Sequence, residues 1–257
     1  MSPEYVMRNL RLLSFNLKGL RDSASFFSWI RSQQVDIVAL QYADLVSLDE
    51  LVFYTGFSQI RVGQRSGLAL LASVPIFQQV QEFDLGAGAS CQVADVRFSI
   101  YRFLLVNLRL CGGVWFRPQQ LHRLFGPDIF QRSHLALPCI LVGDFFDGIW
   151  LSMFKPFQQN LKRVAPFWCR ATYPACFPLI ARDRIYKMNG IMVNQVEILY
   201  CIRERFLCSH LPLFLNFTLS QDFISLPVGL KLFDKFKSVP GNTFMNLRSV
   251  DNFYVGS

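Results

Sequence analysis

The sequence predicts an α/β protein in which two β-sheets pack against each other and helices lie outside them. Of the 257 residues, 52% are hydrophobic and 17% are charged, which indicates a thick core built from sheets buried on both faces. Most apolar segments are short and strand-like, while helical patterns occur only after the first strand and near the middle of the chain. This combination favours packed sheets covered by a few helices.

The strands follow from apolar or alternating segments that are bounded by turn residues. The first segment alternates and is rich in Leu and Phe, and Gly63-Gln64-Arg65-Ser66 has the composition of a hairpin turn. In chain order, the predicted strands are residues 9–17, 36–41, 59–62, 67–72, 76–85, 91–100, 102–110, 138–142, 183–187, 192–201 and 213–219.

Helical patterns are fewer. Asp22 is placed to cap a helix in which Phe26, Phe27 and Ile30 have the spacing of one buried face. The predicted helices are residues 22–33, 117–125 and 131–134.

Residues 1–220 are predicted to form one domain, because no flexible linker and no change of composition divides the strands. The pattern weakens after residue 219, so residues 221–257 are predicted to be a C-terminal extension that packs on the domain or trails from it. A partner-binding tail is the alternative.

No segment of the sequence predicts a transmembrane helix. The longest apolar stretches, residues 135–142 and 211–219, contain eight or nine residues, whereas a spanning helix needs about 20. The N-terminal residues lack the apolar core of a signal peptide, so we expect an intracellular, cytoplasmic protein.

The seven cysteines indicate reduced thiols, because their number is odd and Cys-x-x-Cys does not occur. With only three histidines, none at ligand spacing from a cysteine pair, a zinc site is not expected. The net charge of +8 favours a polyanionic partner such as nucleic acid, an anionic membrane surface or a phosphorylated ligand. The indication is weak, because the Lys and Arg residues are scattered.

Three polar clusters lie where apolar strands end. They are Gly143-Asp144-Phe145, Asp183-Arg184-Ile185-Tyr186 and Ser209-His210-Leu211-Pro212. Only a folded sheet brings such distant segments together, and strand ends can hold a carboxylate and an imidazole at a fixed separation. Asp144, Asp183 and His210 are therefore the candidate catalytic residues.

Seven segments, in order, match a set of motifs. They are residues 12–17, 35–41, 67–76, 105–110, 140–145, 172–186 and 209–212. For example, residues 140–145 resemble I-L-x-G-D-F-N, residues 172–186 resemble T-F-P…F-P-L…L-D-R-I-Y, and residues 209–212 resemble S-D-H-L-P. Together they make the chain resemble the exonuclease–endonuclease–phosphatase superfamily, the DNase I-like proteins.

This resemblance implies a four-layer α/β/β/α sandwich with a site at one end of both sheets. It also implies a divalent ion, Mg²⁺ or alternatively Mn²⁺, with Asn16 among its oxygen ligands. Asp144 stands at the position that orients the attacking water, and Asp183 and His210 stand at the pair that stabilises charge on the phosphate. A phosphodiester under attack gains negative charge on its non-bridging oxygens, which explains the need for a cation and donors.

Four residues depart from the family pattern. Tyr42 stands where the family has a metal-binding Glu, Arg109 stands at a His near the phosphate, Phe146 replaces the Asn of Gly-Asp-Phe-Asn, and Ser209 replaces the Asp before the final His. The loss of two carboxylates weakens the attraction for Mg²⁺, which dehydrates reluctantly. We therefore expect the metal site to be weakened or absent.

Two nearby residues leave alternatives open. Asp44 would replace the missing Glu only after a shift of two residues, about 7 Å along a strand, so we do not expect it to do so. Arg109 would either grip a phosphate bidentately or face solvent at a strand edge.

The retained residues have ordinary structural interpretations as well. Asp144 could be a turn carboxylate, Asp183 could form an ion pair with Arg182 or Arg184, and His210 could be a core histidine.

The sequence favours a pseudoenzyme of this fold that has lost or strongly reduced catalysis, with a phosphate-containing ligand or nucleic acid as its partner. The alternative is an active, altered phosphodiesterase that acts on nucleic acid or lipid headgroups through Asp144, Asp183 and His210. Removal of one catalytic donor costs about 10²–10³ in rate, so four departures weigh against turnover. A membrane-surface scaffold is a third hypothesis, based on composition alone.

Overall fold

The structure, a computed structural model, describes residues 9–129, 137–146, 161–164, 171–188, 190–200 and 208–220. All of them fall within one unit of the fold, Met1–Leu226. The predicted helix 131–134 and the predicted extension 221–257 lie outside the described residues, so the domain boundary at residue 220 stays a prediction.

The first sheet joins the two ends of the described chain. Its strand order is β11-β12-β1-β2-β4-β3. The strands are β1 (Leu10–Asn16), β2 (Ile37–Gln41), β3 (Gln59–Val62), β4 (Leu68–Ala72), β11 (Ile191–Ile198) and β12 (Leu213–Leu219). Because β1 is parallel to β2 and antiparallel to β12, the segment before β12 lies beside the segment after β1.

The second sheet has the order β5-β6-β7-β8-β10-β9. The strands are β5 (Phe77–Gly86), β6 (Ala89–Phe98), β7 (Tyr101–Arg109), β8 (Cys139–Asp144), β9 (Lys162–Arg163) and β10 (Asp183–Met188). The parallel pair β7 and β8 lies at its centre, and β10 runs antiparallel to β8.

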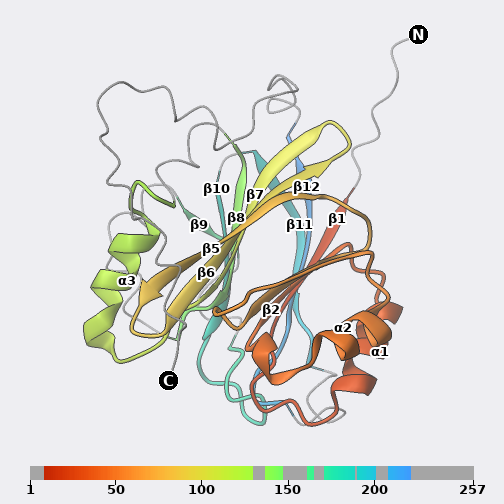
Figure 1. Ribbon diagram of the computed structural model, residues 1–257, viewed down its shortest axis with the longest axis horizontal. Helices are drawn as coiled ribbons and strands as arrows, with labels where there is room; N and C mark the ends of the chain where they lie inside the picture. Colours follow the sequence, from red (N-terminus) through yellow and green to blue (C-terminus); the bar gives the residue numbers. More distant parts are fainter. Residues whose placement is uncertain are drawn as a thin grey trace, which may run out of the picture. The chain divides into compact units, whose positions relative to one another are not determined.

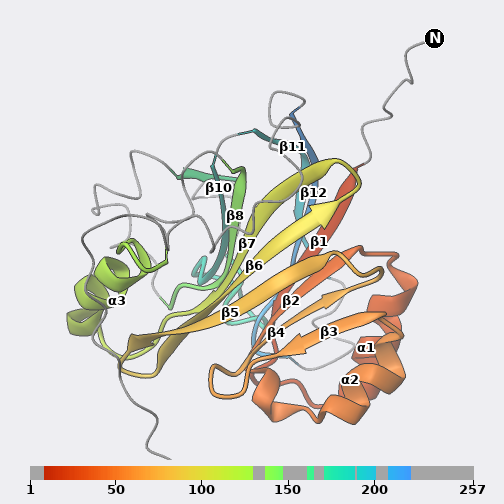
Figure 2. The ribbon, with the colours of Figure 1, turned by 45° about the horizontal axis from the view of Figure 1, so that its top comes forward.

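Helices cover the outer faces of both sheets, as Figures 1 and 2 show. α1 (Ser23–Ser32) and α2 (Leu48–Thr55) lie outside the first sheet, where Phe26, Phe27 and Leu51 join one buried cluster with strand residues such as Phe15. α3 (Arg117–Leu124) lies on the side of the second sheet, next to β5. Short 3-10 turns occupy Ala43–Leu45 and Val114–Phe116. The predicted four-layer α/β/β/α sandwich is therefore confirmed.

The predicted strands, and the helices expected at 22–33 and 117–125, begin and end within three residues of the expected positions. The Asp22 carboxylate accepts the Ser25 N–H and caps α1, as expected. The helix α2 is not among the predicted elements, although its capping box is present in the sequence. The Glu50 N–H donates to Ser47 Oγ (3.2 Å) and the Ser47 N–H donates to Glu50 Oε2 (3.1 Å).

A second buried cluster fills the space between the sheets, and at one end its apolar side chains give way to polar ones. Alternate residues of each strand point into it, for example Leu12 and Ala39 from the first sheet and Leu105 and Val142 from the second. Further along the same faces the side chains become polar. The buried polar residues at this end are Asn16, Gln41, Ser90, Asn107, Asp144 and Asp183. Buried polar groups need partners, so this end of the sandwich is where a site is expected.

In the described part of the chain, no helix is long and apolar enough to cross a membrane. The described cysteines, Cys91, Cys111, Cys139, Cys176 and Cys208, are free thiols. Cys169 and Cys201 lie outside the described residues.

Candidate functional site

The register of the second sheet aligns four residues in one row. Ser90 pairs with Arg109, Arg109 with Asp144, and Asp144 with Asp183. Directly paired residues point to the same face, here the inter-sheet face, and neighbouring strands lie about 4.8 Å apart. The row therefore brings two of the predicted catalytic residues together with Arg109.

Gly143 makes this register possible. Its φ is +138°, and a Cβ at this position would overlap the carbonyl oxygen of Leu108 on β7. Only glycine lets the two parallel strands approach closely and still turn the next side chain, Asp144, toward the other sheet.

Asp183 and His210 form the predicted pair. His210 Nδ1 lies 2.8 Å from Asp183 Oδ2, and both side chains are buried. Among the described residues, His210 Nε2 and Asp183 Oδ1 have no hydrogen-bond partner. The Tyr173 ring packs against the imidazole with the ring centroids 4.8 Å apart. Each residue of this pair therefore keeps one polar atom without a hydrogen-bond partner among the described residues.

The expected alternative for Asp183 is wrong, because its partner is His210 and not an arginine. Arg184 instead donates to the Ala181 carbonyl (2.8 Å) and the Tyr186 hydroxyl (3.3 Å). Arg182 forms its ion pair with Asp144 instead.

Asp144 accepts four hydrogen bonds. Oδ1 accepts from the Phe146 N–H (2.8 Å) and from Arg182 Nε (2.9 Å). Oδ2 accepts from Arg182 Nη2 (3.0 Å) and from Asn16 Nδ2 (2.9 Å). A carboxylate offers about four lone-pair positions, so all of those of Asp144 are in use.

Arg182 is the residue that the sequence analysis missed as part of the site. Its side chain is only 11% exposed, and its guanidinium meets Asp144 with two parallel hydrogen bonds. The guanidinium carbon lies 4.2 Å from the centre of the Phe146 ring and 5.0 Å from that of Tyr173. A signal existed, because the L-D-R-I-Y motif has an apolar residue where this chain has Arg182.

The protonation of this pair reflects opposing effects. Burial raises the pKa of Asp144, the neighbouring Asp183 carboxylate adds to the increase, and Arg182 opposes it. Burial lowers the pKa of Arg182, but its hydrogen bonds and charge attraction to Asp144 outweigh burial, so the Arg182 pKa is raised overall. Four donors directed at one carboxylate favour its ionised form. The pair is therefore an ion pair.

Asn16, the predicted metal ligand, is engaged with protein groups on both sides. Its Nδ2 donates to Asp144, and its Oδ1 accepts the Lys18 N–H (2.9 Å). The amide therefore links the carboxylate to the end of β1.

Tyr42 stands in a left-handed conformation (φ 56°) just after β2. Its half-buried ring lies close to two cations, with Arg109 Cζ 4.6 Å and Lys18 Nζ 5.5 Å from the ring centre. Burial raises the pKa of the phenol, Asp144 adds to the increase, and Arg109 opposes it. The phenol therefore stays neutral where the family places a carboxylate.

The remaining departures also serve structural contacts. The Ser209 hydroxyl donates to the Lys18 carbonyl, and Phe146 packs on Arg182. The Asp44 side chain is 59% exposed and lies 3.9 Å from Arg109. The Asp44 carboxylate is directed at Arg109 near the surface, and the expectation that Asp44 is not a metal ligand stays a prediction.

The residues present do not fit a divalent cation. Among the described residues, no three His, Cys, Asp or Glu side chains converge as a metal site would require. Mg²⁺ needs near-octahedral oxygen ligands, yet the lone pairs of Asp144 are occupied and Asn16 Oδ1 accepts a backbone N–H.

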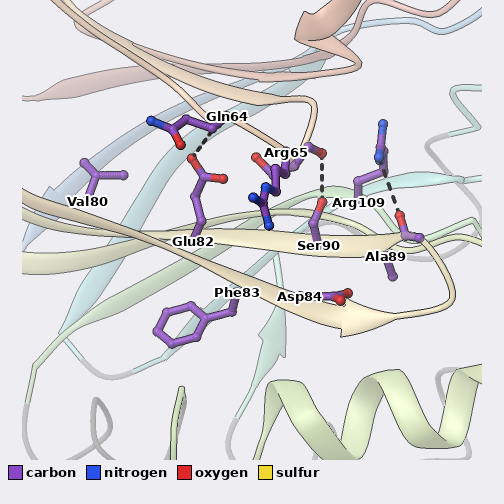
Figure 3. A pocket seen from close by; sticks show the side chains of 11 residues that line it. Gln64, Arg65, Val80, Glu82, Phe83, Asp84, Ala89, Ser90 and Arg109 are labelled. Carbon is purple, nitrogen blue, oxygen red and sulfur yellow. Dashed lines mark hydrogen bonds between the residues drawn. The ribbon is translucent and has the colours of Figure 1, made fainter. Parts of the chain in front are cut away.

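Arg109 is held in place and is not a solvent-facing edge residue. Its side chain is 16% exposed, and its Nη2 donates to the Gly88 carbonyl (3.5 Å). It belongs to the wall of a cavity of about 620 Å³ between the β3–β4 turn and strands β5 and β6 (Figure 3). This volume is within the range of small-molecule sites.

The walls of this cavity carry both signs of charge. Arg65 and Arg109 are cationic, and Glu82 and Asp84 are anionic. Both carboxylates are partly used by the backbone, because Glu82 accepts the Gln64 N–H (3.0 Å) and Asp84 accepts the Gly86 N–H (2.7 Å).

Comparison with solved structures identifies the architecture. A humanised TDP2 of D. rerio is 16% identical with a TM-score of 0.66, over 82% of this chain and 99% of that chain. An endonuclease/exonuclease/phosphatase from Bacteroides vulgatus is 15% identical with a TM-score of 0.66, over 83% and 100%. This is the endonuclease/exonuclease/phosphatase fold.

The same fold occurs in the mannosyl-6-phosphatase Bt3783 of Bacteroides thetaiotaomicron, which is 14% identical with a TM-score of 0.62 over 82% of this chain and 100% of that chain. No family model and no curated protein matched the sequence. The endonuclease/exonuclease/phosphatase fold is therefore recognised through its three-dimensional arrangement, in agreement with the motif order in the sequence.

Proposed function

We propose that this protein is a pseudoenzyme of the endonuclease/exonuclease/phosphatase fold that binds a phosphate-containing ligand without metal-dependent hydrolysis. The observation that carries the proposal is the saturation of Asp144 by four donors, two of them from Arg182. A carboxylate in this state has no lone pair for a water nucleophile, so it can neither orient nor deprotonate one.

The surroundings of Asp144 support the same proposal. Tyr42 supplies a neutral ring in place of a carboxylate, and Ser209 uses its hydroxyl on the Lys18 carbonyl. Each replacement removes a negative charge that would attract a hard cation. Loss of one positioned catalytic group costs about 10²–10³ in rate, and several losses around one reacting centre leave little turnover.

Binding of a phosphate group is supported by the cations near the row. Arg109 and Lys18 both lie close to the Tyr42 ring, and Arg109 Nε has no hydrogen-bond partner among the described residues. Guanidinium groups recognise phosphates through several donors at once. The D. rerio TDP2 structure in complex with a single-strand DNA product makes single-stranded DNA a suitable first probe.

The second candidate function is a metal-independent phosphodiesterase. It is favoured by the retained Asp183–His210 pair, in which His210 Nε2 and Asp183 Oδ1 remain without partners among the described residues. A positioned imidazole can donate a proton to a phosphate oxygen or leaving group. Such an enzyme would work in the presence of EDTA.

The test combines turnover and binding on the full chain. Plasmid DNA and bis-p-nitrophenyl phosphate are incubated with the protein in Mg²⁺, in Mn²⁺ and in EDTA. We expect no turnover above the protein-free background in any of the three. Metal-dependent turnover that Asp144→Ala abolishes would overturn the proposal, and EDTA-resistant turnover that His210→Ala abolishes would establish the second candidate.

Binding is measured with pyrophosphate and a single-stranded oligonucleotide by calorimetry. We expect Arg109→Gln to weaken binding at least tenfold, because it removes a partly buried cation of the cavity wall. Arg61→Gln is the matched control, since Arg61 is an exposed residue of β3 outside the cavity lining and undergoes the same change of charge. An equal loss in both variants would reduce the effect to general charge attraction and contradict a site at Arg109.

A further inference from the structure

Arg182 forms its ion pair next to two adjacent carboxylates of the same row. Asp144 and Asp183 are directly paired Cα partners on β8 and β10, a relation that places them about 4.5–5.5 Å apart at Cα. Both side chains are buried, and each carboxylate raises the energy of the other as an ion. Such a pair requires a cation or a proton.

The cation present is a side chain. The guanidinium of Arg182 donates to both oxygens of Asp144, and its pKa is raised through its hydrogen bonds with Asp144 and the charges of Asp144 and Asp183, which outweigh burial. The rings of Phe146 and Tyr173 pack against the guanidinium. Its central carbon lies 4.2 Å from the centre of the Phe146 ring and 5.0 Å from that of Tyr173. Arg182 and Phe146 both depart from the motif residues, and the two departures form one contact.

We propose that Arg182 is an internal cation that takes the place of a divalent ion at this end of the sandwich, which makes the site independent of metal. The inference deepens the proposed function, because it names the residue that closes the site. The guanidinium neutralises Asp144, as a metal ion would. It cannot bind and acidify a water molecule, which is the catalytic contribution of a metal ion.

This proposal predicts that removal of Arg182 creates a site for a divalent cation. Without the guanidinium, Asp144 regains two lone-pair positions, and Asp183 Oδ1 already has no partner among the described residues. Two adjacent carboxylates with free oxygens are the kind of ligands that Mg²⁺ and Mn²⁺ take.

The experiment measures the thermal unfolding of Arg182→Leu, which introduces the residue of the L-D-R-I-Y motif. In EDTA we expect the Tm to fall by about 5–10 °C, because a buried carboxylate loses its ion partner. Addition of 5 mM MnCl₂ should raise the Tm of the variant by about 3 °C or more through binding to the folded state. The wild-type Tm should not change with MnCl₂.

Arg102→Leu provides the matched control. Arg102 also forms a bidentate pair, with Asp95 (2.8 and 2.7 Å), and its side chain is likewise 11% exposed. Asp95 lies on β6, and Arg102 lies on β7 toward the end opposite to Arg109. We expect a comparable loss of stability in EDTA and no recovery with MnCl₂.

A second variant separates metal binding from nonspecific stabilisation. In the double variant Arg182→Leu, Asp144→Asn the carboxylate that needs the cation is gone, so the response to MnCl₂ should disappear. If Arg182→Leu alone does not fold in EDTA, its refolding yield with and without MnCl₂ becomes the measurement, and equal yields overturn the proposal.

Two other results would overturn it. One is a saturable MnCl₂ response of the wild-type protein. The other is an Arg182→Leu variant that is destabilised without any response to MnCl₂. Neither depends on catalysis, so EDTA-resistant turnover by the wild type would remove the proposed function and leave this inference standing.

Discussion

Asp144 and Asp183 are neighbours in one row, and both match the motif residues of the superfamily, yet their surroundings differ. Asp144 is saturated by four donors, and one of its partners is a fixed cation. Asp183 has a single side-chain partner, His210, and an oxygen without a partner among the described residues. All lone pairs of the Asp144 carboxylate are therefore used, whereas Asp183 keeps one oxygen without a hydrogen-bond partner among the described residues.

The difference teaches that two residues that both match a motif can have different surroundings. Asp144 is in the expected place on the expected strand, and its hydrogen bonds are largely set by Arg182. The comparison between the two carboxylates therefore provides the most direct tests of the site.

The largest effect is expected from Asp144→Asn. The amide keeps the size of the carboxylate but leaves the mostly buried Arg182 guanidinium without its ion partner. We expect the free energy of unfolding to fall by about 3–5 kcal/mol, measured by urea unfolding at neutral pH. A loss below that of Asp183→Asn would contradict the assignment of Asp144 as the more strongly held carboxylate.

Asp183→Asn is expected to have a smaller effect. It removes one charge-assisted hydrogen bond to His210 and leaves the Asp144–Arg182 pair intact. The expected loss is about 1.5–3 kcal/mol. The ¹⁵N chemical shifts of the imidazole should also change, because the His210 ring loses its carboxyl partner at Nδ1, whereas Asp144→Asn should leave these shifts closer to those of the wild type.

Phe146→Leu tests the ring that covers Arg182. Leucine keeps most of the apolar contact but removes the cation–π interaction, so we expect a loss of about 0.5–1 kcal/mol. Phe177→Leu is the control, because the Phe177 side chain is 69% exposed and a change there should stay within about 0.5 kcal/mol. Equal losses in both variants would show that the ring contact with Arg182 contributes nothing specific.

The smallest effect concerns the alkaline stability of the protein. The pKa of Tyr42 in the folded protein is raised above its ordinary value of 10.0. The unfolded chain therefore loses this proton at a lower pH than the folded protein does. The contribution of Tyr42 to the free energy of unfolding is therefore fully present below pH 10 and is lost as the pH rises through the pKa of Tyr42 in the folded protein. Tyr42→Phe should remove this part of the pH dependence, measured by urea unfolding at a series of pH values above 9.

The elements of the fold could be predicted because each carries its own periodicity. Alternation over five to ten residues marks β1, β6 and β7, and the Asp22 cap with its three spaced apolar residues marks α1. The helix α2 was missed because it is short and most of its apolar residues stay exposed, among them Val52 (52%) and Phe53 (76%). Its only clear sequence signal is the capping box of Ser47 and Glu50.

The positions of Asp144, Asp183 and His210 could be predicted because each lies at or next to the end of a strand, and these strand ends meet at one end of the two packed sheets. The hydrogen-bond partner of each residue could not be predicted. The sequence leaves Arg182 open as a partner of Asp183, but in the structure the Arg182 side chain donates to Asp144, and His210 reaches Asp183 from the segment before β12.

By itself, the sequence determined the two sheets, the helices outside them and the polar edge at which strands end, because these depend on hydrophobic period and on turn residues over short distances. Only the tertiary structure decided which carboxylate is paired with a cation and which stays open. That choice depends on strand register and on side chains from segments far apart in the chain, which place a guanidinium against Asp144 and an imidazole against Asp183.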